Sequence, residues 1–172
     1  MSFLRPAADE FAPYYATYVS KVADADILDV LREQGEAFGG LFARVPDDKR
    51  LFVYAEGKWT LAEAIQHISD TERVFAYRAL RVARGDTLSL PGFDQDHWIP
   101  TSEANARSLQ SLVEEFTAIR AASVALFAGL PASAWDRRGT ASNNPVSVRG
   151  QAFILAGHAL HHQGIIRERY LP

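Results

Sequence analysis

Four long stretches of the chain place apolar residues three and four positions apart, and this pattern constrains the fold most. They cover roughly residues 8–43, 60–85, 102–128 and 147–170. The spacing corresponds to one face of an α-helix, and no stretch alternates apolar and polar residues as a half-buried strand does. We therefore expect an all-α four-helix bundle. A break near Ala23 and Asp24 predicts a short N-terminal arm, about residues 1–24, before the first helix.

The second stretch has the clearest ends. Thr60 and Glu63 have the spacing of a capping box, in which each side chain accepts a hydrogen bond from the backbone N–H of the other. Glu63 has a second possible role, because it lies one turn before His67 and a carboxylate there could orient that imidazole. We favour the capping role. Gly85 is typical of a residue that ends a helix.

Composition excludes several classes of protein. The 172 residues predict one domain, 1–172, with a formal charge of −3, which argues against a nucleic-acid binder. No apolar run is long enough to span a membrane, and no secretory signal is visible, so we expect a cytoplasmic protein. The chain has five histidines and no cysteine. Any metal must therefore be held by histidines and carboxylates, and a cysteine nucleophile is excluded.

The last predicted helix carries two histidines within its apolar stripe. His158 and His162 are four residues apart, so they lie on one face of the helix, one turn apart. Two imidazoles at this spacing can share one metal ion, and they can equally form a hydrogen-bonded pair in the core. The spacing leaves both interpretations open. His161 points about 100° away from His162, so we expect it to be a neighbour rather than a ligand.

His67, at the edge of the apolar stripe of the second helix, is the natural third ligand. It lies near the start of its helix, while His158 and His162 lie near the end of theirs. The three side chains reach similar depth only if the two helices run antiparallel. This favours an up-down-down-up bundle over the simple up-down-up-down order. The unusually long connection, residues 86–101, would then be the crossover between the second and third helices.

The crossover contains further polar candidates. Asp94, Asp96 and His97 could approach a metal as a general base or as an additional ligand. The alternative is ordinary turn and capping chemistry, which is common for aspartate. Four arginines of the second helix are expected to form a solvated face: Arg73, Arg78, Arg81 and Arg84.

Three segments together resemble the DinB-like superfamily, in the DinB_2 branch that includes YfiT-like metalloenzymes. They are residues 59–68, 90–96 and 157–166, and the resemblance extends over nearly the whole chain. It implies an up-down-down-up four-helix bundle and a metal triad of His67, His158 and His162. It also implies a divalent ion, nickel or zinc above all, and a homodimer. Gln163 departs from the family pattern, in which many members have arginine after the paired histidines.

The resemblance also implies what such a site does. Characterised relatives include thiol-dependent transferases and isomerases, so S-transfer with a low-molecular-weight thiol is the leading prediction for a metal-dependent enzyme acting on a small molecule. Metal-dependent hydrolysis is the close alternative, because a metal such as zinc lowers the pKa of a bound water molecule toward 7. A non-catalytic, metal-stabilised structural or stress-response protein is the third. No nucleic-acid or membrane partner is expected.

Overall fold

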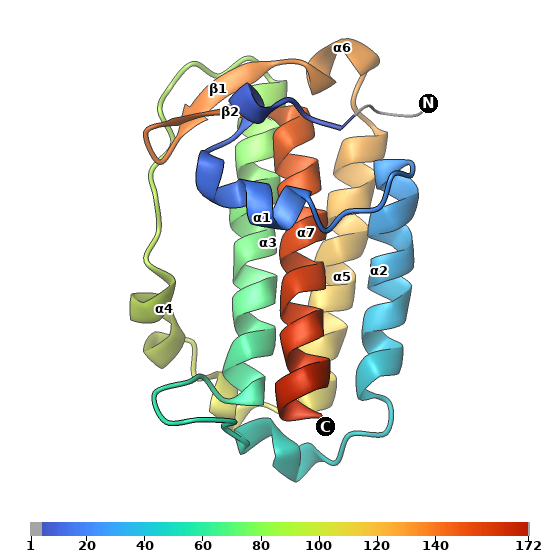
Figure 1. Ribbon diagram of the computed structural model, residues 1–172, viewed down its shortest axis with the longest axis vertical. Helices are drawn as coiled ribbons and strands as arrows, with labels where there is room; N and C mark the ends of the chain where they lie inside the picture. Colours follow the sequence, from blue (N-terminus) through green and yellow to red (C-terminus); the bar gives the residue numbers. More distant parts are fainter. Residues whose placement is uncertain (1–4, 172) are drawn as a thin grey trace.

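The computed structural model describes residues 5–171. Outside this range lie Pro172 and residues 1–4, which begin the predicted arm. A secretory signal would also begin at residues 1–4. Four helices form the bundle: α2 (Ile27–Phe42), α3 (Leu61–Ala83), α5 (Leu109–Ala128) and α7 (Val148–Ile165). α2 and α7 run in one direction and α3 and α5 in the other (Figure 1), which confirms the predicted topology. α3 packs against both α5 and α7, and α2 packs against α5.

Short elements surround the bundle. Three are α-helical: α1 (Ala16–Val19), α4 (Gln95–Thr101) and α6 (Ala132–Trp135). Four are 3₁₀ turns: Ala8–Glu10, Pro13–Tyr15, Asp47–Leu51 and Ala104–Ala106. α7 continues into a wider π-helical turn, Ile166–Tyr170. Among the described helices, none is both long and apolar enough to cross a membrane.

Two predictions about secondary structure are wrong. A two-stranded antiparallel hairpin, β1 (Arg138–Ala141) and β2 (Asn144–Ser147), lies where only a polar loop was expected. Ser142 and Asn143 between the strands have positive φ, which is typical of a tight hairpin turn. The third long helix begins at Leu109 rather than near residue 102. Glu103 adopts a left-handed conformation that interrupts the helix, and Ser108 caps the new start through its side chain.

The crossover from α3 to α5 is held at both ends. At the upper end Leu90 pairs with the hairpin, and Arg78 donates hydrogen bonds to Pro91 O and to Ser142 Oγ. Arg78 is 3% exposed, so its assignment to a solvated face is wrong. At the lower end Asn105 donates to Glu63 Oε1, while the predicted capping box with Thr60 is present. α4 therefore lies along the outside of the bundle (Figure 1).

The N-terminal arm packs directly on α7 through two glycines. A Cβ on Gly157 would lie 2.0 Å from the carbonyl oxygen of Tyr18, and one on Gly150 would lie 2.6 Å from the carbonyl oxygen of Glu10. Only glycine permits such close approach of two backbones. Buried Glu10 adds a hydrogen bond, accepted from Ser147 Oγ at 2.6 Å. The arm is thus seated at a defined height on α7.

A buried polar network joins the four helices of the bundle. Arg120 on α5 donates two hydrogen bonds to the Glu72 carboxylate on α3, at 2.6 and 2.7 Å, and both side chains are almost fully buried. Arg120 also donates to Gln34 Oε1 on α2, and Gln34 Nε2 donates to the Ala156 carbonyl of α7. Because every charge has its partner, the network specifies how the helices align.

We expect Arg120→Met to lower the free energy of unfolding by about 3–5 kcal/mol, because the Glu72 carboxylate would be left buried and unpaired. The double variant Glu72→Leu with Arg120→Met should recover part of this loss. Arg32→Met, which breaks an exposed pair with Asp29, is the control and should change stability by less than about 1 kcal/mol. Urea denaturation measures all three. Equal losses for Arg120→Met and Arg32→Met would contradict the role of the network.

Candidate metal centre

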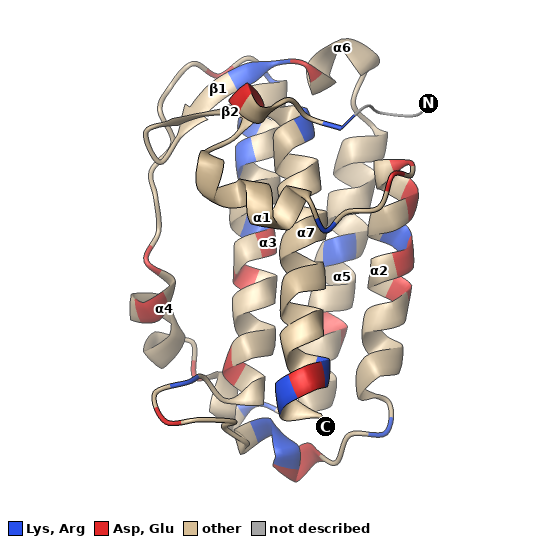
Figure 2. Cartoon of the chain, viewed as in Figure 1, with Lys and Arg blue, Asp and Glu red and all other residues tan. Residues whose placement is uncertain are grey.

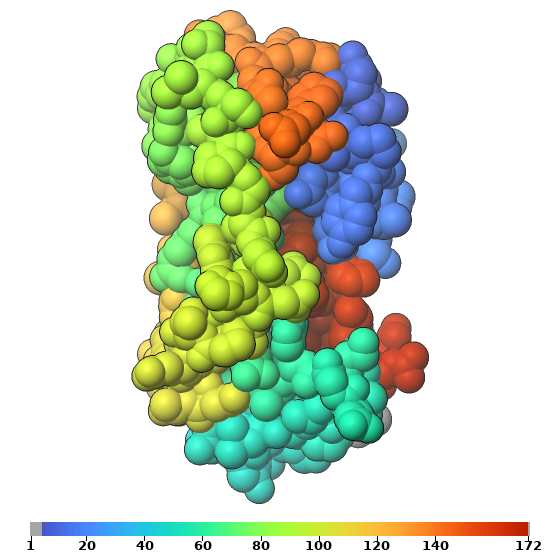
Figure 3. All heavy atoms as spheres, turned by 90° about the vertical axis from the view of Figure 1, so that its left-hand side faces the viewer, coloured from blue at the N-terminus to red at the C-terminus, as the bar shows by residue number. Residues whose placement is uncertain are grey.

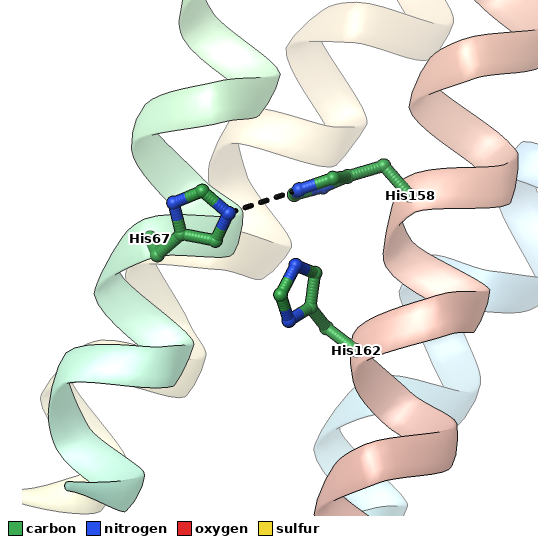
Figure 4. Close-up of side chains that lie close together, drawn as sticks. All are labelled: His67, His158 and His162. Carbon is green, nitrogen blue, oxygen red and sulfur yellow. Dashed lines mark hydrogen bonds between the residues drawn. The ribbon is translucent and has the colours of Figure 1, made fainter. Parts of the chain in front are cut away.

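Three histidines converge between α3 and α7. His67 lies within the first two turns of α3, and His158 and His162 lie in the last turns of α7. Their rings point toward one another from the two helices (Figure 4). The antiparallel packing of α3 and α7 produces this meeting, because the beginning of one helix lies beside the end of the other.

The spacing of the ring nitrogens fits a single shared ion. One nitrogen from each of the three imidazoles lies within 4.8 Å of the others. His67 Nε2 and His158 Nε2 are 3.0 Å apart and are hydrogen-bonded to each other. Three imidazoles with an open side are the protein ligands of some catalytic zinc sites. Among the described residues, these three are the set whose geometry fits a metal ion.

The surroundings keep the three imidazoles neutral, as metal ligands must be. His67 is 4% and His158 is 5% exposed, while His162 is half-buried. Burial lowers the pKa of His67 to about 4, because the interior disfavours the charged ring. Burial and the neighbouring histidines also hold the pKa values of His158 and His162 well below the usual range. α7 carries no charged residue between Arg149 and Arg167 (Figure 2).

Aromatic rings hold the imidazoles from the sides. The Trp59 ring lies 4.8 Å from the ring of His67, and the Tyr18 ring meets His158 nearly edge-on at 5.4 Å. His161 lies against Tyr18 and His162, with ring centres 5.3 and 5.0 Å away, outside the triad, which agrees with the neighbour role predicted for it. Neither Tyr18 nor Trp59 was predicted from the sequence to be a site residue. Trp59 directly precedes the capping box at the start of α3, and this position was the one sign in the sequence that its ring lies near His67.

Two cavities open beside the triad. A cavity of about 240 Å³ borders His162 and is lined by Tyr54, Gly57, Lys58, Trp59, Ala64, Asp96, Ile165, Ile166 and Tyr170. A second, of about 290 Å³, borders His158 and is lined by Tyr14, Tyr15, Tyr18, Thr71, Phe75, Phe93, Asp94 and Gln95. We call them the His162 cavity and the His158 cavity. In Figure 3, α7 is visible in a hollow between the arm, the crossover and the segment before α3.

The crossover residues divide between the two cavities. Asp96 lines the His162 cavity and Asp94 lines the His158 cavity. Asp94 also caps α4 by accepting hydrogen bonds from the backbone N–H groups of Asp96 and His97. His97 is exposed and lines neither cavity. The geometry thus brings two of the three predicted crossover residues to the site.

The comparisons with known proteins agree with this fold. A sequence model of the DinB superfamily matches residues 31–166, so the chain belongs to the DinB superfamily. A protein of Oceanobacillus iheyensis, named "Putative metal-dependent hydrolase OB0413", is 26% identical over 123 residues, which are 70% of each chain. The solved structure of YfiT from Bacillus subtilis superposes with a TM-score of 0.72 at 15% identity, over 96% of this chain and 90% of that one. YfiT is described as "a probable metal-dependent hydrolase with an unusual four-helix bundle topology", and the likeness here is one of fold.

Replacing a ligand should abolish metal binding without unfolding the protein. We expect His67→Ala and His158→Ala each to lose stoichiometric binding of zinc or nickel, measured by calorimetric titration and elemental analysis. His161→Ala is the matched control, because its ring lies beside the triad yet outside it, and it should bind one ion. Stoichiometric metal in His67→Ala would contradict the triad.

Acid should destabilise the metal-free protein through the same imidazoles. An unfolded histidine binds a proton below about pH 6.5, whereas folded His67 does so only below about 4. Between these values the unfolded state binds more protons, so stability falls as the pH falls, by up to about 1.4 kcal/mol per pH unit for one such group. Urea titrations from pH 7 to pH 4 should show a shallower decline for His67→Gln. His97→Gln is the exposed control, and equal slopes in His67→Gln and the unchanged protein would contradict this assignment.

Proposed function

We propose that this protein is a metal-dependent hydrolase of small molecules, with a divalent ion held by His67, His158 and His162. The observation that carries the proposal is the convergence of three neutral imidazoles between two open cavities. The descriptions of the Oceanobacillus protein and of YfiT support the same reaction class. The triad fits a metal because one nitrogen of each imidazole lies within 4.8 Å of the others, and because the rings of His67 and His158 contact aromatic rings rather than charged side chains.

Zinc and nickel are the ions we propose, since both suit imidazole ligands. When bound, such an ion supplies Lewis-acid chemistry, which polarises a carbonyl group and makes water acidic near neutral pH.

We assign Asp96 the role of general base. Its carboxylate shares the His162 cavity with Lys58 and Trp59, so it is placed to accept a proton from an attacking water molecule. Lys58 offers a positive charge to an anionic group of the substrate or to charge that develops on oxygen. Asp94 holds the first turn of α4 and so positions Asp96. A catalytic contribution from His97 stays a prediction.

S-transfer with a low-molecular-weight thiol is the second candidate function. The observation in its favour is that the triad borders two separate cavities, which would accommodate a thiol on one side and an electrophile on the other. The chain has no cysteine, so the thiol must come from outside.

The homodimer and the cytoplasmic location stay predictions.

The zinc-loaded protein should hydrolyse an activated ester such as p-nitrophenyl acetate, and EDTA should abolish the activity while leaving the protein folded. Asp96→Asn should lower kcat by about 100-fold with unchanged metal content, because a general base contributes a factor of this order. Asp48→Asn, on an exposed turn, is the control and should keep full activity.

Two results would overturn the hydrolase proposal, and a third would remove the role of one residue within it. Full activity in Asp96→Asn would remove the role of the base. Consumption of an added thiol with an electrophile, without ester hydrolysis, would favour S-transfer. Unfolding on chelation, with no turnover of either kind, would favour the metal-stabilised structural protein.

A further inference from the structure

We infer that the His158 cavity binds an uncharged aromatic ring of the substrate. This inference rests on the proposed function, because it places the ring beside the triad and the bond to be hydrolysed next to His158. The substrate class is an ester or an amide whose acyl group carries the aromatic ring. On hydrolysis the water oxygen bonds to the carbonyl carbon, the carbon–oxygen or carbon–nitrogen bond breaks, and the leaving atom takes up a proton.

The walls of the cavity are aromatic on several sides. Tyr14 and Tyr15 meet at 5.4 Å with nearly perpendicular rings, and Tyr15 meets Phe75 in the same way at 5.5 Å. Phe93 contributes a ring from the crossover. Edge-to-face packing is the arrangement in which one more ring gains most from aromatic neighbours. Such a cavity therefore prefers an aryl group to an alkyl chain.

The size of the cavity agrees with one ring and its linker. Its volume is about 290 Å³. An apolar cavity of about 150 Å³ accommodates benzene, so a ring leaves space here for the atoms that join it to the reacting carbonyl. Tyr15, Tyr18 and Phe93 are half-buried, as expected of side chains that line an opening.

The charges around the cavity disfavour an ionised ring substituent. The Arg78 guanidinium lies 5.0 Å from the ring centre of Phe75 and 5.7 Å from that of Phe93, so these faces already contact a cation. Asp94, an acidic residue, also lines the cavity. Because one charge of each sign lies beside the cavity, neither a cationic nor an anionic substituent gains a net attraction, so a neutral ring, which avoids the cost of losing its hydration, is favoured.

A polar group on the ring has a partner available. Thr71 lines the cavity one turn after His67, is 2% exposed, and its hydroxyl has no hydrogen-bond partner within residues 5–171. An unpaired buried hydroxyl is unfavourable, so a ligand that supplies an amide or hydroxyl would be bound more tightly.

The arm supplies one wall of this cavity. Tyr14, Tyr15 and Tyr18 precede the residues that the superfamily model matches, 31–166. The close contact of Gly157 with Tyr18 sets their height on α7. The arm therefore brings aromatic side chains to this cavity from outside the segment that the superfamily model matches.

The test measures binding without catalysis. Phenylacetamide is titrated into the protein in EDTA and followed by NMR, with acetamide, phenylacetate and phenethylammonium as comparison ligands. Phenylacetamide should bind most tightly. Tyr15→Leu in the arm and Phe93→Leu in the crossover should each weaken it by about threefold or more, since an aromatic pair contributes a factor of this order. Tyr15→Phe, which keeps the ring, and Tyr77→Leu, on an exposed part of α3, should bind as the unchanged protein does.

The inference is overturned if acetamide or a charged analogue binds as well as phenylacetamide, or if both leucine variants keep full affinity while circular dichroism shows them folded. Metal content and hydrolysis of phenylacetate and acetate esters are measured on the same preparations. Hydrolysis without preference for the ring would overturn this inference and leave the proposed function standing. Binding of the ring by a protein that takes up metal and does not hydrolyse esters would support the cavity and overturn the hydrolase.

Discussion

The buried ion pair between Arg120 and Glu72 is the interaction on which the rest of the structure depends. Two charges inside a bundle are unfavourable unless each meets its partner with good geometry, so the pair permits only one alignment of α3 with α5. Gln34 on α2 accepts a hydrogen bond from Arg120 and donates one to the Ala156 carbonyl of α7, so the alignment of these two helices depends on the same network. Ala156 lies two residues before His158, and Glu72 lies close to His67 on α3. The alignment that satisfies the charges is therefore the alignment that brings the three imidazoles together.

Two segments outside the bundle, the crossover and the N-terminal arm, enclose the cavities beside the three histidines. The crossover is fixed above by Arg78 and below by Asn105, so α4 lies beside the triad and not free in solvent. The arm is fixed on α7 because glycine at 150 and 157 lets two backbones touch. Each segment brings side chains that the bundle alone lacks: Asp96 to the His162 cavity, and the tyrosines to the His158 cavity. The bundle thus supplies the three histidines, while the connections supply side chains that line the cavities beside them.

The chemistry of the site follows from how little charge surrounds it. The imidazoles sit on an uncharged length of α7, and burial keeps them neutral and ready to bind a cation. A cation there would have its charge offset by few protein carboxylates, so it would remain a strong Lewis acid. Asp96 is the nearby carboxylate that lines a cavity with His162. This combination of a neutral triad with an acid at its edge suits the activation of water, and it also leaves room for a thiol from outside.

The sequence by itself determined the four helices, the capping box at Thr60, the pairing of His158 with His162 and, through the depth of His67, the order of the helices. These follow from periodicity and spacing along one chain, which local physics controls. Only the tertiary structure decided that Arg120, Glu72 and Arg78 are buried, since a charged residue reads as solvent-exposed until its partner on another helix is known. The hairpin was missed because its strands are short and its turn depends on positive φ at Ser142 and Asn143. The cavities could not be predicted because they are formed by residues that are distant in sequence. Tyr15 and Phe93 line the same cavity only because the arm and the crossover pack beside each other on the bundle.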